Sequence, residues 1–224
     1  MIKAVIFDFD GLIIDTETPE YESFQAMYRD HGMELTMDLW GLCIGTDGSA
    51  FEPYSYLEQA LGAPIDRETV RKLRRQRYTD RMSEVQPRPG VIDYLKEANE
   101  LGLQIGLASS STREWVTGYL KQFDLIDYFM CIRTKDDVEK VKPDPALYLQ
   151  AMSCLGVQPV EAIAFEDSPN GSLAAKRAGM HCVIVPNEIT GLLRFGEHDL
   201  RLPSMSAMPL TEVISRVSIT RKEC

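Results

Sequence analysis

Short apolar runs recur along the chain and predict a series of β-strands. They occupy residues 3–8, 103–109, 128–134, 162–166 and 181–186. Segments with helical periodicity separate most of them, at residues 113–123, 145–155 and 169–178. Weaker patterns predict a last edge strand at 199–202 and a closing helix at 210–217. Because strands and helices alternate, the pattern indicates an α/β fold with a parallel sheet and right-handed crossovers.

The stretch between the first two apolar runs is too long for a single crossover. From residue 16 to residue 85 the periodicity is helical throughout. Its first apolar positions share one helix face, at Tyr21, Phe24, Met27 and Tyr28. We therefore predict two domains, which are a core of residues 1–15 and 86–224 and an inserted all-α cap of residues 16–85. Short segments at both boundaries would act as paired hinges that let the cap close over the sheet edge.

Composition narrows the class of protein. The net charge of −10 makes nucleic acid and anionic membranes unlikely partners, and no apolar run approaches the ~18 residues of a membrane span. A hydrophobic content of 44% is enough for one core with a small accessory domain. We expect the protein to be a monomer or a weak dimer. The cysteines are odd in number and widely spaced, so we expect reduced thiols in a cytoplasmic protein. They are Cys43, Cys131, Cys154, Cys182 and Cys224.

The first apolar run ends in two carboxylates, Asp8 and Asp10, followed by Gly11. Ligands of open α/β sheets bind at the carboxyl ends of the strands. Two aspartates there are costly unless a cation joins them, and a glycine turn lets both face one pocket beside a metal. The alternative is that this segment is only a strand-ending turn.

The second apolar run leads into a serine cluster that could hold a phosphoryl group. Ser109, Ser110 and Ser111 precede a predicted helix, and Ser111 with Glu114 has the spacing of a capping box. Hydroxyls and free N–H groups at a helix start form a cradle for phosphoryl oxygens. The alternative is that these serines only cap the helix.

Two further segments carry charged candidates. Lys142 precedes Pro143, which keeps it extended at a loop edge, and the fourth apolar run ends in Glu166 and Asp167. In isolation, a solvated lysine and a turn with neighbouring acids are ordinary surface features. Together with Asp8 they form one electrostatic unit, because carboxylates around a phosphate dianion repel each other unless Mg²⁺ and a lysine balance them.

These segments, taken in order, resemble the four motifs of the haloacid dehalogenase superfamily phosphatases. They are D-F-D-G-x-x-x-D-T at 8–16, Ser109, Lys142-Pro143 and Glu166-Asp167. The resemblance covers nearly the whole chain and points to the subgroup of phosphoglycolate phosphatase and β-phosphoglucomutase. It implies a Rossmann-like parallel sheet core with an inserted all-α cap domain.

The resemblance also implies a role for each motif residue. Asp8 would attack phosphorus and form an aspartyl-phosphate, while Asp10 would protonate the leaving oxygen and then activate water. Ser109 and Lys142 would hold the transferring group. Mg²⁺ would be bound by Asp8, the main-chain carbonyl of Asp10 and Asp167, with Glu166 in support.

Substrate recognition is expected to depend on residues outside the motifs. The cap candidates are Thr16, Glu20 and Arg77, and the candidates beside the serines are Ser110 and Arg113. The mutase branch carries a histidine and a phosphate-binding arginine in the cap, where this chain has Glu20 and Gly48. The basic run from Arg67 to Arg81 is otherwise typical of a solvated helix face.

We therefore expect a Mg²⁺-dependent phosphatase that hydrolyses a small phosphorylated metabolite of the sugar phosphate or phosphoglycolate type. A β-phosphoglucomutase-like sugar phosphomutase is the first alternative, and the two departures at positions 20 and 48 count against it. A catalytically silent binding module on the same fold is the second. The intact motif acids and Lys142 count against that reading.

Overall fold

A computed structural model describes residues 1–41 and 52–220. Its sheet has six parallel strands in the order β3-β2-β1-β4-β5-β6. The strands are β1 Ala4–Phe7, β2 Gln104–Ala108, β3 Cys131–Arg133, β4 Ala162–Glu166, β5 His181–Ile184 and β6 Leu200–Arg201. The predicted α/β class is confirmed. The third strand is shorter than the predicted 128–134, because residues before it form the 3₁₀ turn Ile126–Tyr128.

The helices are α1 Glu17–Asp30, α2 Met37–Trp40, α3 Pro53–Leu61, α4 Arg67–Met82, α5 Val91–Glu100, α6 Arg113–Gln122, α7 Ala146–Leu155, α8 Pro169–Arg177 and α9 Leu210–Thr220. Further 3₁₀ turns lie at Lys135–Asp137, Pro159–Glu161, Thr190–Leu192 and Met205–Ala207. In the described ranges, no helix is both long and apolar enough to cross a bilayer.

The sheet is covered by helices on both faces. Val5 and Phe7 point into a layer with α5, α6 and α9, whereas Ala4 and Ile6 point into a layer with α7 and α8. All four side chains are buried, which explains why this strand reads as a continuous apolar run rather than an alternating one. The strand is therefore the centre of the core.

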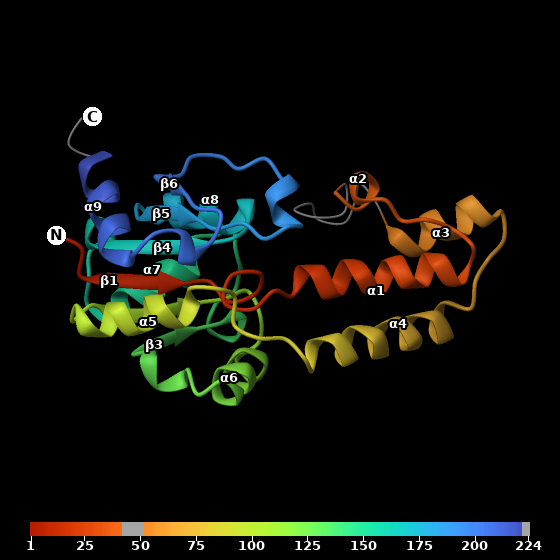
Figure 1. Ribbon diagram of the computed structural model, residues 1–224, viewed down its shortest axis with the longest axis horizontal. Helices are drawn as coiled ribbons and strands as arrows, with labels where there is room; N and C mark the ends of the chain where they lie inside the picture. Colours follow the sequence, from red (N-terminus) through yellow and green to blue (C-terminus); the bar gives the residue numbers. More distant parts are fainter. Residues whose placement is uncertain (42–51, 221–224) are drawn as a thin grey trace.

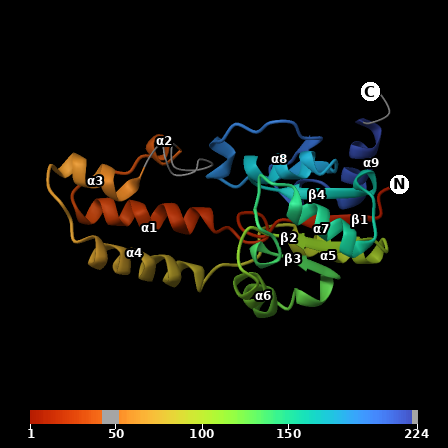
Figure 2. The ribbon, with the colours of Figure 1, turned by 180° about the vertical axis from the view of Figure 1, so that it is seen from behind.

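Helices α1 to α4 form the cap, which lies beyond the carboxyl ends of the strands (Figures 1 and 2). The predicted apolar face of α1 is buried, and its aromatic rings pack with Trp40 and Tyr54. Helix α4 runs beside α1 in both views. Arg74 of α4 lies over the Phe24 ring, 4.2 Å from its centroid, and Arg71 lies 5.1 Å from that of Tyr54. A strongly basic helix thus covers an aromatic core through stacked guanidinium groups.

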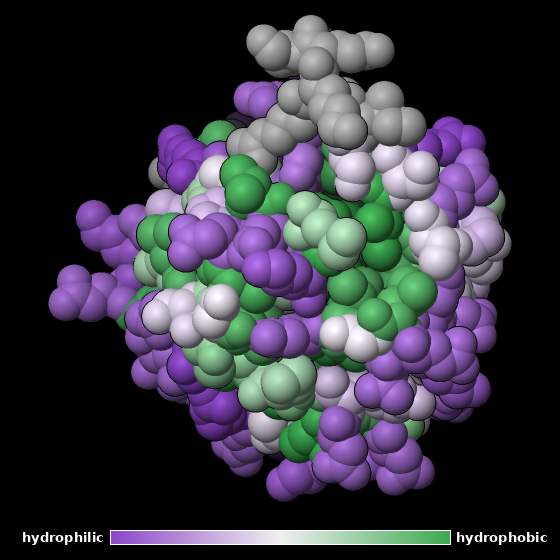
Figure 3. Space-filling model, turned by 90° about the vertical axis from the view of Figure 1, so that its left-hand side faces the viewer, coloured by the Kyte–Doolittle hydropathy of each residue, from purple (hydrophilic) through white to green (hydrophobic). Residues whose placement is uncertain are grey.

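The end of the molecule opposite the cap carries apolar side chains among polar ones (Figure 3). Exposed Met1, Leu101, Met130 and Val160 each come shortly before a strand. Because the strands are parallel, these residues belong to the amino-terminal edge of the sheet. The charged candidates of the sequence lie at the other edge.

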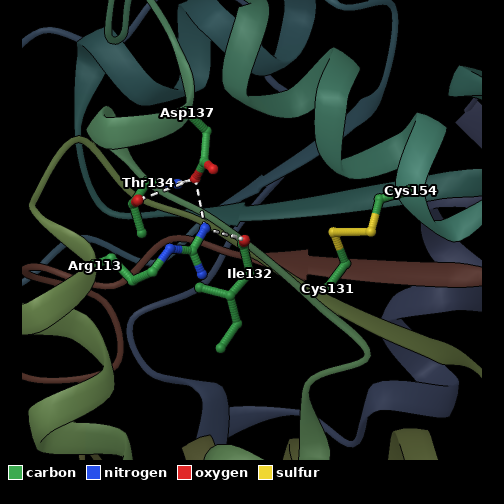
Figure 4. The surroundings of a disulfide bond; sticks show 6 residues. All are labelled: Arg113, Cys131, Ile132, Thr134, Asp137 and Cys154. Atoms are coloured by element: carbon green, nitrogen blue, oxygen red, sulfur yellow. Dashed lines mark hydrogen bonds and ion pairs between the residues drawn. A yellow bond between two sulfur atoms is a disulfide. The ribbon is translucent and has the colours of Figure 1, made fainter.

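Cys131 of β3 and Cys154 of α7 form a disulfide, with Cα atoms 6.3 Å apart (Figure 4). The prediction of reduced thiols is therefore wrong for these two. The strand and the helix face each other in the fold, which the spacing of 23 residues along the sequence does not reveal. Cys182 is free and buried. Cys43 and Cys224 lie outside the described residues.

Candidate functional site

The carboxyl ends of the central strands lie at one edge of the sheet because these strands are parallel neighbours. Phe7 of β1 pairs with Leu107 of β2 and with Phe165 of β4. This register places Asp8 level with Ala108 and puts Ser109 one residue further along, below a cavity of about 570 Å³ between the sheet edge and the cap. The core side of the cavity is lined by Asp8, Asp10, Ser110, Ser111, Lys142 and Asp167.

Lys142 is buried at the base of this cavity rather than solvated. Its Nζ lies 2.6 Å from Asp8 Oδ1 and 2.6 Å from Glu166 Oε1, and its side chain is 5% exposed. Burial alone lowers the pKa of Lys142, but the charges of Asp8 and Glu166 outweigh it and raise the pKa above its ordinary value. The ammonium group thus stays charged at any ordinary pH.

The three acids beside it form a compact cluster. Carboxylate oxygens of Asp8, Glu166 and Asp167 lie within 4.8 Å of one another. Burial, together with mutual repulsion, raises the pKa of Glu166 to about 7 and that of Asp167 well above its ordinary range. Burial likewise raises the pKa of Asp8, although Lys142 opposes the shift.

The donor set of this cluster fits a hard divalent cation. Glu166 is already bound by Lys142, by the Tyr148 hydroxyl at 2.6 Å and by Ser168 at 3.3 Å. Among the described residues, the hydrogen-bond partner of the Asp167 carboxylate is the Asn187 amide, at 3.1 Å. A buried carboxylate with so few partners calls for positive charge. Asp8 and Asp167 would therefore supply the oxygen ligands that Mg²⁺ prefers.

Glycine residues let the backbone pass close to these acids. Gly11 has a φ of +79°, and a Cβ there would collide with the Asp167 carboxylate. A Cβ at Gly171 in α8 would collide with Glu166 in the same way. Gly11 is thus required both for its left-handed backbone and for the close approach of the Asp167 carboxylate.

Asp10 stands beside the cluster and is held by two donors. The Trp115 indole Nε1 donates to its Oδ1 at 2.8 Å, and the Ser109 hydroxyl donates to its Oδ2 at 3.3 Å. Ser109 Oγ in turn accepts a bond from the Ser111 backbone N–H at 2.9 Å. Helix α6 begins at Arg113 and is capped by Thr112, whose side chain accepts from Trp115 N. The predicted capping box of Ser111 and Glu114 is therefore wrong by one residue.

Comparison with known proteins agrees with this arrangement. The family model described as haloacid dehalogenase-like hydrolase matches residues 5–185. The chain belongs to this family. It is 54% identical to the protein named "Putative phosphatase YhcW" of Bacillus subtilis over 218 residues, which covers 97% of this chain and 99% of the relative.

More distant relatives of this hydrolase also match it over nearly the whole length of both chains. Hexitol phosphatase B of Escherichia coli is 31% identical over 220 residues, covering 95% of this chain and 97% of the relative. A crystal structure described as a "putative beta-phosphoglucomutase" from Thermotoga maritima superimposes with a TM-score of 0.75 at 27% identity, covering 96% of this chain and 99% of that one. The predicted superfamily and the Rossmann-like core with a helical cap are thereby confirmed.

The cap contributes acidic and aromatic side chains to the cavity of this hydrolase. They are Glu17, Glu20, Phe24, Trp40, Glu52 and Tyr54. Glu20, a predicted substrate-binding residue, lines the cavity and pairs with Arg74 at 2.9 Å. Thr16 is buried beside Asp10 in an adjoining cavity, and its hydroxyl has no hydrogen-bond partner among the described residues.

The structure does not bring two of the predicted substrate-binding cations to the cavity. Arg77 pairs with Asp30 at 2.5 Å on the outer side of the cap. Arg113 donates to Asp137 at 2.7 Å and to the Ile132 carbonyl at 3.1 Å (Figure 4). Each guanidinium group is paired with a nearby acid and does not line the cavity, and contact of either residue with the substrate stays a prediction. Gly48 lies outside the described residues.

Sequence reasoning missed three residues that support the site. Trp115 is described above. Arg88, at the second hinge, donates to the carbonyls of Gly11, Val185 and Pro186 and so ties this hinge to the first loop. Asn187 binds Asp167, as noted above. The sequence signal that could have identified Asn187 was its position just after a predicted strand. The only signal in the sequence for Arg88 was its position between two prolines.

Glu17, also missed, gives a testable pH dependence. Burial, followed by the charges of Asp10 and Asp15, raises its pKa to about 7 from an ordinary 4.5. The folded metal-free protein therefore binds this proton more tightly than the unfolded chain, so stability falls as the pH rises from about 4.5 to about 7. Glu17→Gln should raise the free energy of unfolding by about 1–2 kcal/mol at pH 8, and by less than half as much at pH 5.

Urea unfolding at the two pH values measures this difference. Glu100→Gln, at the exposed end of α5, is the matched control and should change neither value by more than about 0.5 kcal/mol. An equal gain from Glu17→Gln at both pH values would contradict the assignment.

Proposed function

We propose that this hydrolase is a Mg²⁺-dependent phosphatase that acts through an aspartyl-phosphate on a small phosphomonoester with an uncharged leaving group. The observation that carries the proposal is the buried pair of Lys142 and Asp8 at the base of the cavity, with Asp167 and Asp10 on either side. Lys142 holds the Asp8 carboxylate ionised and oriented. The names of its relatives as phosphatases support the same reaction class.

In the first step an Asp8 oxygen forms a bond to phosphorus, and the bond from phosphorus to the leaving oxygen breaks. Asp10 gives its proton to that oxygen. In the second step water attacks phosphorus, its proton passes to Asp10, and the bond to Asp8 breaks. Ser109 and Lys142 orient the transferring group. A divalent cation held by Asp8 and Asp167 would neutralise charge that otherwise repels the phosphate dianion.

The cap side of the cavity favours a leaving group without negative charge. Among the described residues that line the cavity, Lys142 is the basic one, and it lies at the phosphoryl end. The cap presents the carboxylates of Glu17, Glu20 and Glu52 beside aromatic rings. Carboxylates accept hydrogen bonds from hydroxyl groups, and aromatic faces pack on sugar carbons. A sugar or sugar alcohol phosphate therefore suits the site better than phosphoglycolate, because the described cap residues that line the cavity offer no cation to pair with its carboxylate.

The same observation disfavours the mutase alternative. A mutase must bind a second phosphate in the cap so that its intermediate can turn over and rebind, and the described cap residues that line the cavity include no basic side chain to bind it. Water should then reach the phosphoenzyme first.

We expect EDTA to abolish phosphate release from a panel of phosphomonoesters and Mg²⁺ to restore it. Ca²⁺ should restore little, because its larger and less regular coordination misplaces the nucleophile. Neutral sugar and sugar alcohol phosphates should exceed phosphoglycolate by at least about tenfold in kcat/KM. Full activity after chelation would show that the reaction does not require a metal ion.

The panel also includes β-glucose 1-phosphate with a catalytic amount of the 1,6-bisphosphate. Formation of glucose 6-phosphate far faster than phosphate release from every monoester would overturn the phosphatase assignment in favour of the mutase.

A further inference from the structure

Each carboxylate oxygen of Asp10 has a donor in the described part of the chain, and the two donors differ in kind. Ser109 Oγ reaches Oδ2 at 3.3 Å, whereas the Trp115 indole reaches Oδ1 at 2.8 Å. The shorter bond comes from α6, which belongs to the core and not to the cap. Asp10 is therefore tied to the domain that holds the nucleophile.

The hydroxyl of Ser109 is free to change partner, but the indole is not. In the proposed reaction Ser109 turns to the phosphoryl group and leaves Asp10. An indole N–H can only donate a hydrogen bond, and the proposed reaction gives it no other partner. Trp115 would then remain as the group that fixes the Asp10 carboxylate during turnover, with Oδ2 left facing the cavity.

Packing holds the indole in place. Its ring meets the Tyr119 ring edge to face, with centroids 4.9 Å apart and an interplanar angle of 70°. Tyr119 packs against Phe9, the residue before Asp10, at 6.4 Å. The Tyr119 hydroxyl donates at 3.4 Å to the carbonyl of Met82, the last residue of cap helix α4. The rings of Tyr119 and Phe9 thus support the indole from the core.

We infer that Trp115 is a positioning residue that aims the Asp10 carboxylate at the leaving oxygen. The inference rests on the proposed role of Asp10 as the acid and base of the reaction. A substrate with a poor leaving group needs a well-placed acid, whereas a nitrophenolate leaves without one. Loss of the indole donor should therefore be selective for poor leaving groups.

Trp115→Phe keeps an aromatic ring and removes the donor. We expect its kcat to fall about 10- to 100-fold on a sugar phosphate and less than about threefold on p-nitrophenyl phosphate, with little change in KM on either. Tyr119→Phe, which removes one hydroxyl from the same aromatic cluster, should leave the ratio of the two rates unchanged. Equal losses on both substrates, or no loss, would overturn the inference.

The proposed hydrogen bond has a readout that does not depend on activity. The chain has two tryptophans, and the Trp40 indole N–H has no partner among the described residues. In a ¹H–¹⁵N spectrum, Asp10→Ala should move the indole signal that Trp115→Phe abolishes and leave the Trp40 signal in place. An unmoved Trp115 signal would contradict the bond.

Asp10→Asn separates this inference from the proposed function. If Asp10→Asn shows no selective loss on the poor leaving group, the acid–base role of Asp10 is wrong. If Asp10→Asn shows that loss and Trp115→Phe does not, the positioning role alone is wrong.

Discussion

Replacing Asp8 with asparagine is expected to reduce turnover of every phosphomonoester by at least about 10⁴-fold, because an amide cannot form the aspartyl-phosphate. The substitution preserves side-chain volume. It also removes one of three crowded acids, while Lys142 keeps Glu166 as a partner at 2.6 Å. The variant should therefore fold, and initial rates with near-UV circular dichroism on the same sample measure both properties.

Asp93→Asn is the matched control for this variant. Asp93 lies in the exposed first turn of α5 and should tolerate the same chemical change with wild-type rates. A folded Asp8→Asn protein that retains more than about 1% of wild-type turnover would remove Asp8 as the nucleophile.

The gathering of Asp8, Ser109, Lys142 and Asp167 at one edge could be predicted from the sequence. Parallel strands place their carboxyl ends together, so apolar runs that end in polar residues identify the site before any contact is known. The same rule does not depend on exact strand limits. It holds although the third strand begins at Cys131 rather than residue 128 and the cap of α6 is Thr112 rather than Ser111.

Side-chain partners far apart in sequence could not be predicted in this way. Arg77 and Arg113 have the charge that a phosphate requires, but acids 47 and 24 residues away bind them instead. The indole of Trp115 reaches Asp10 across 105 residues. Periodicity and motif spacing report on one segment at a time, whereas such pairs depend on how two segments pack.

The disulfide between Cys131 and Cys154 escaped prediction for the same reason. Both residues lie in apolar segments of the sequence, and such a segment reads the same whether its cysteine is a free thiol or is bonded. Only the packing of α7 against β3 brings the two sulfur atoms together.

Lys142→Ala is expected to lower the free energy of unfolding of the metal-free protein by about 3–5 kcal/mol, because it leaves buried Asp8 and Glu166 without their cation. Exposed Lys140→Ala is the control and should change stability by less than about 0.5 kcal/mol. Urea unfolding measures both. A loss below about 1 kcal/mol would show that the cluster does not need the ammonium group.

The loss caused by Lys142→Ala should also depend on pH in a definite direction. Burial and Asp8 raise the pKa of Glu166 to about 7 from 4.5 even with Lys142 present. The folded protein therefore holds protons that the unfolded chain releases between these values, and stability falls as the pH rises through that window. Without Lys142 the same acids are harder to ionise, so the destabilisation should be larger at pH 8 than at pH 5.5. A larger loss at pH 5.5 would mean that removing Lys142 does not raise the pKa values of these acids, and that the ammonium group does not hold Asp8 ionised.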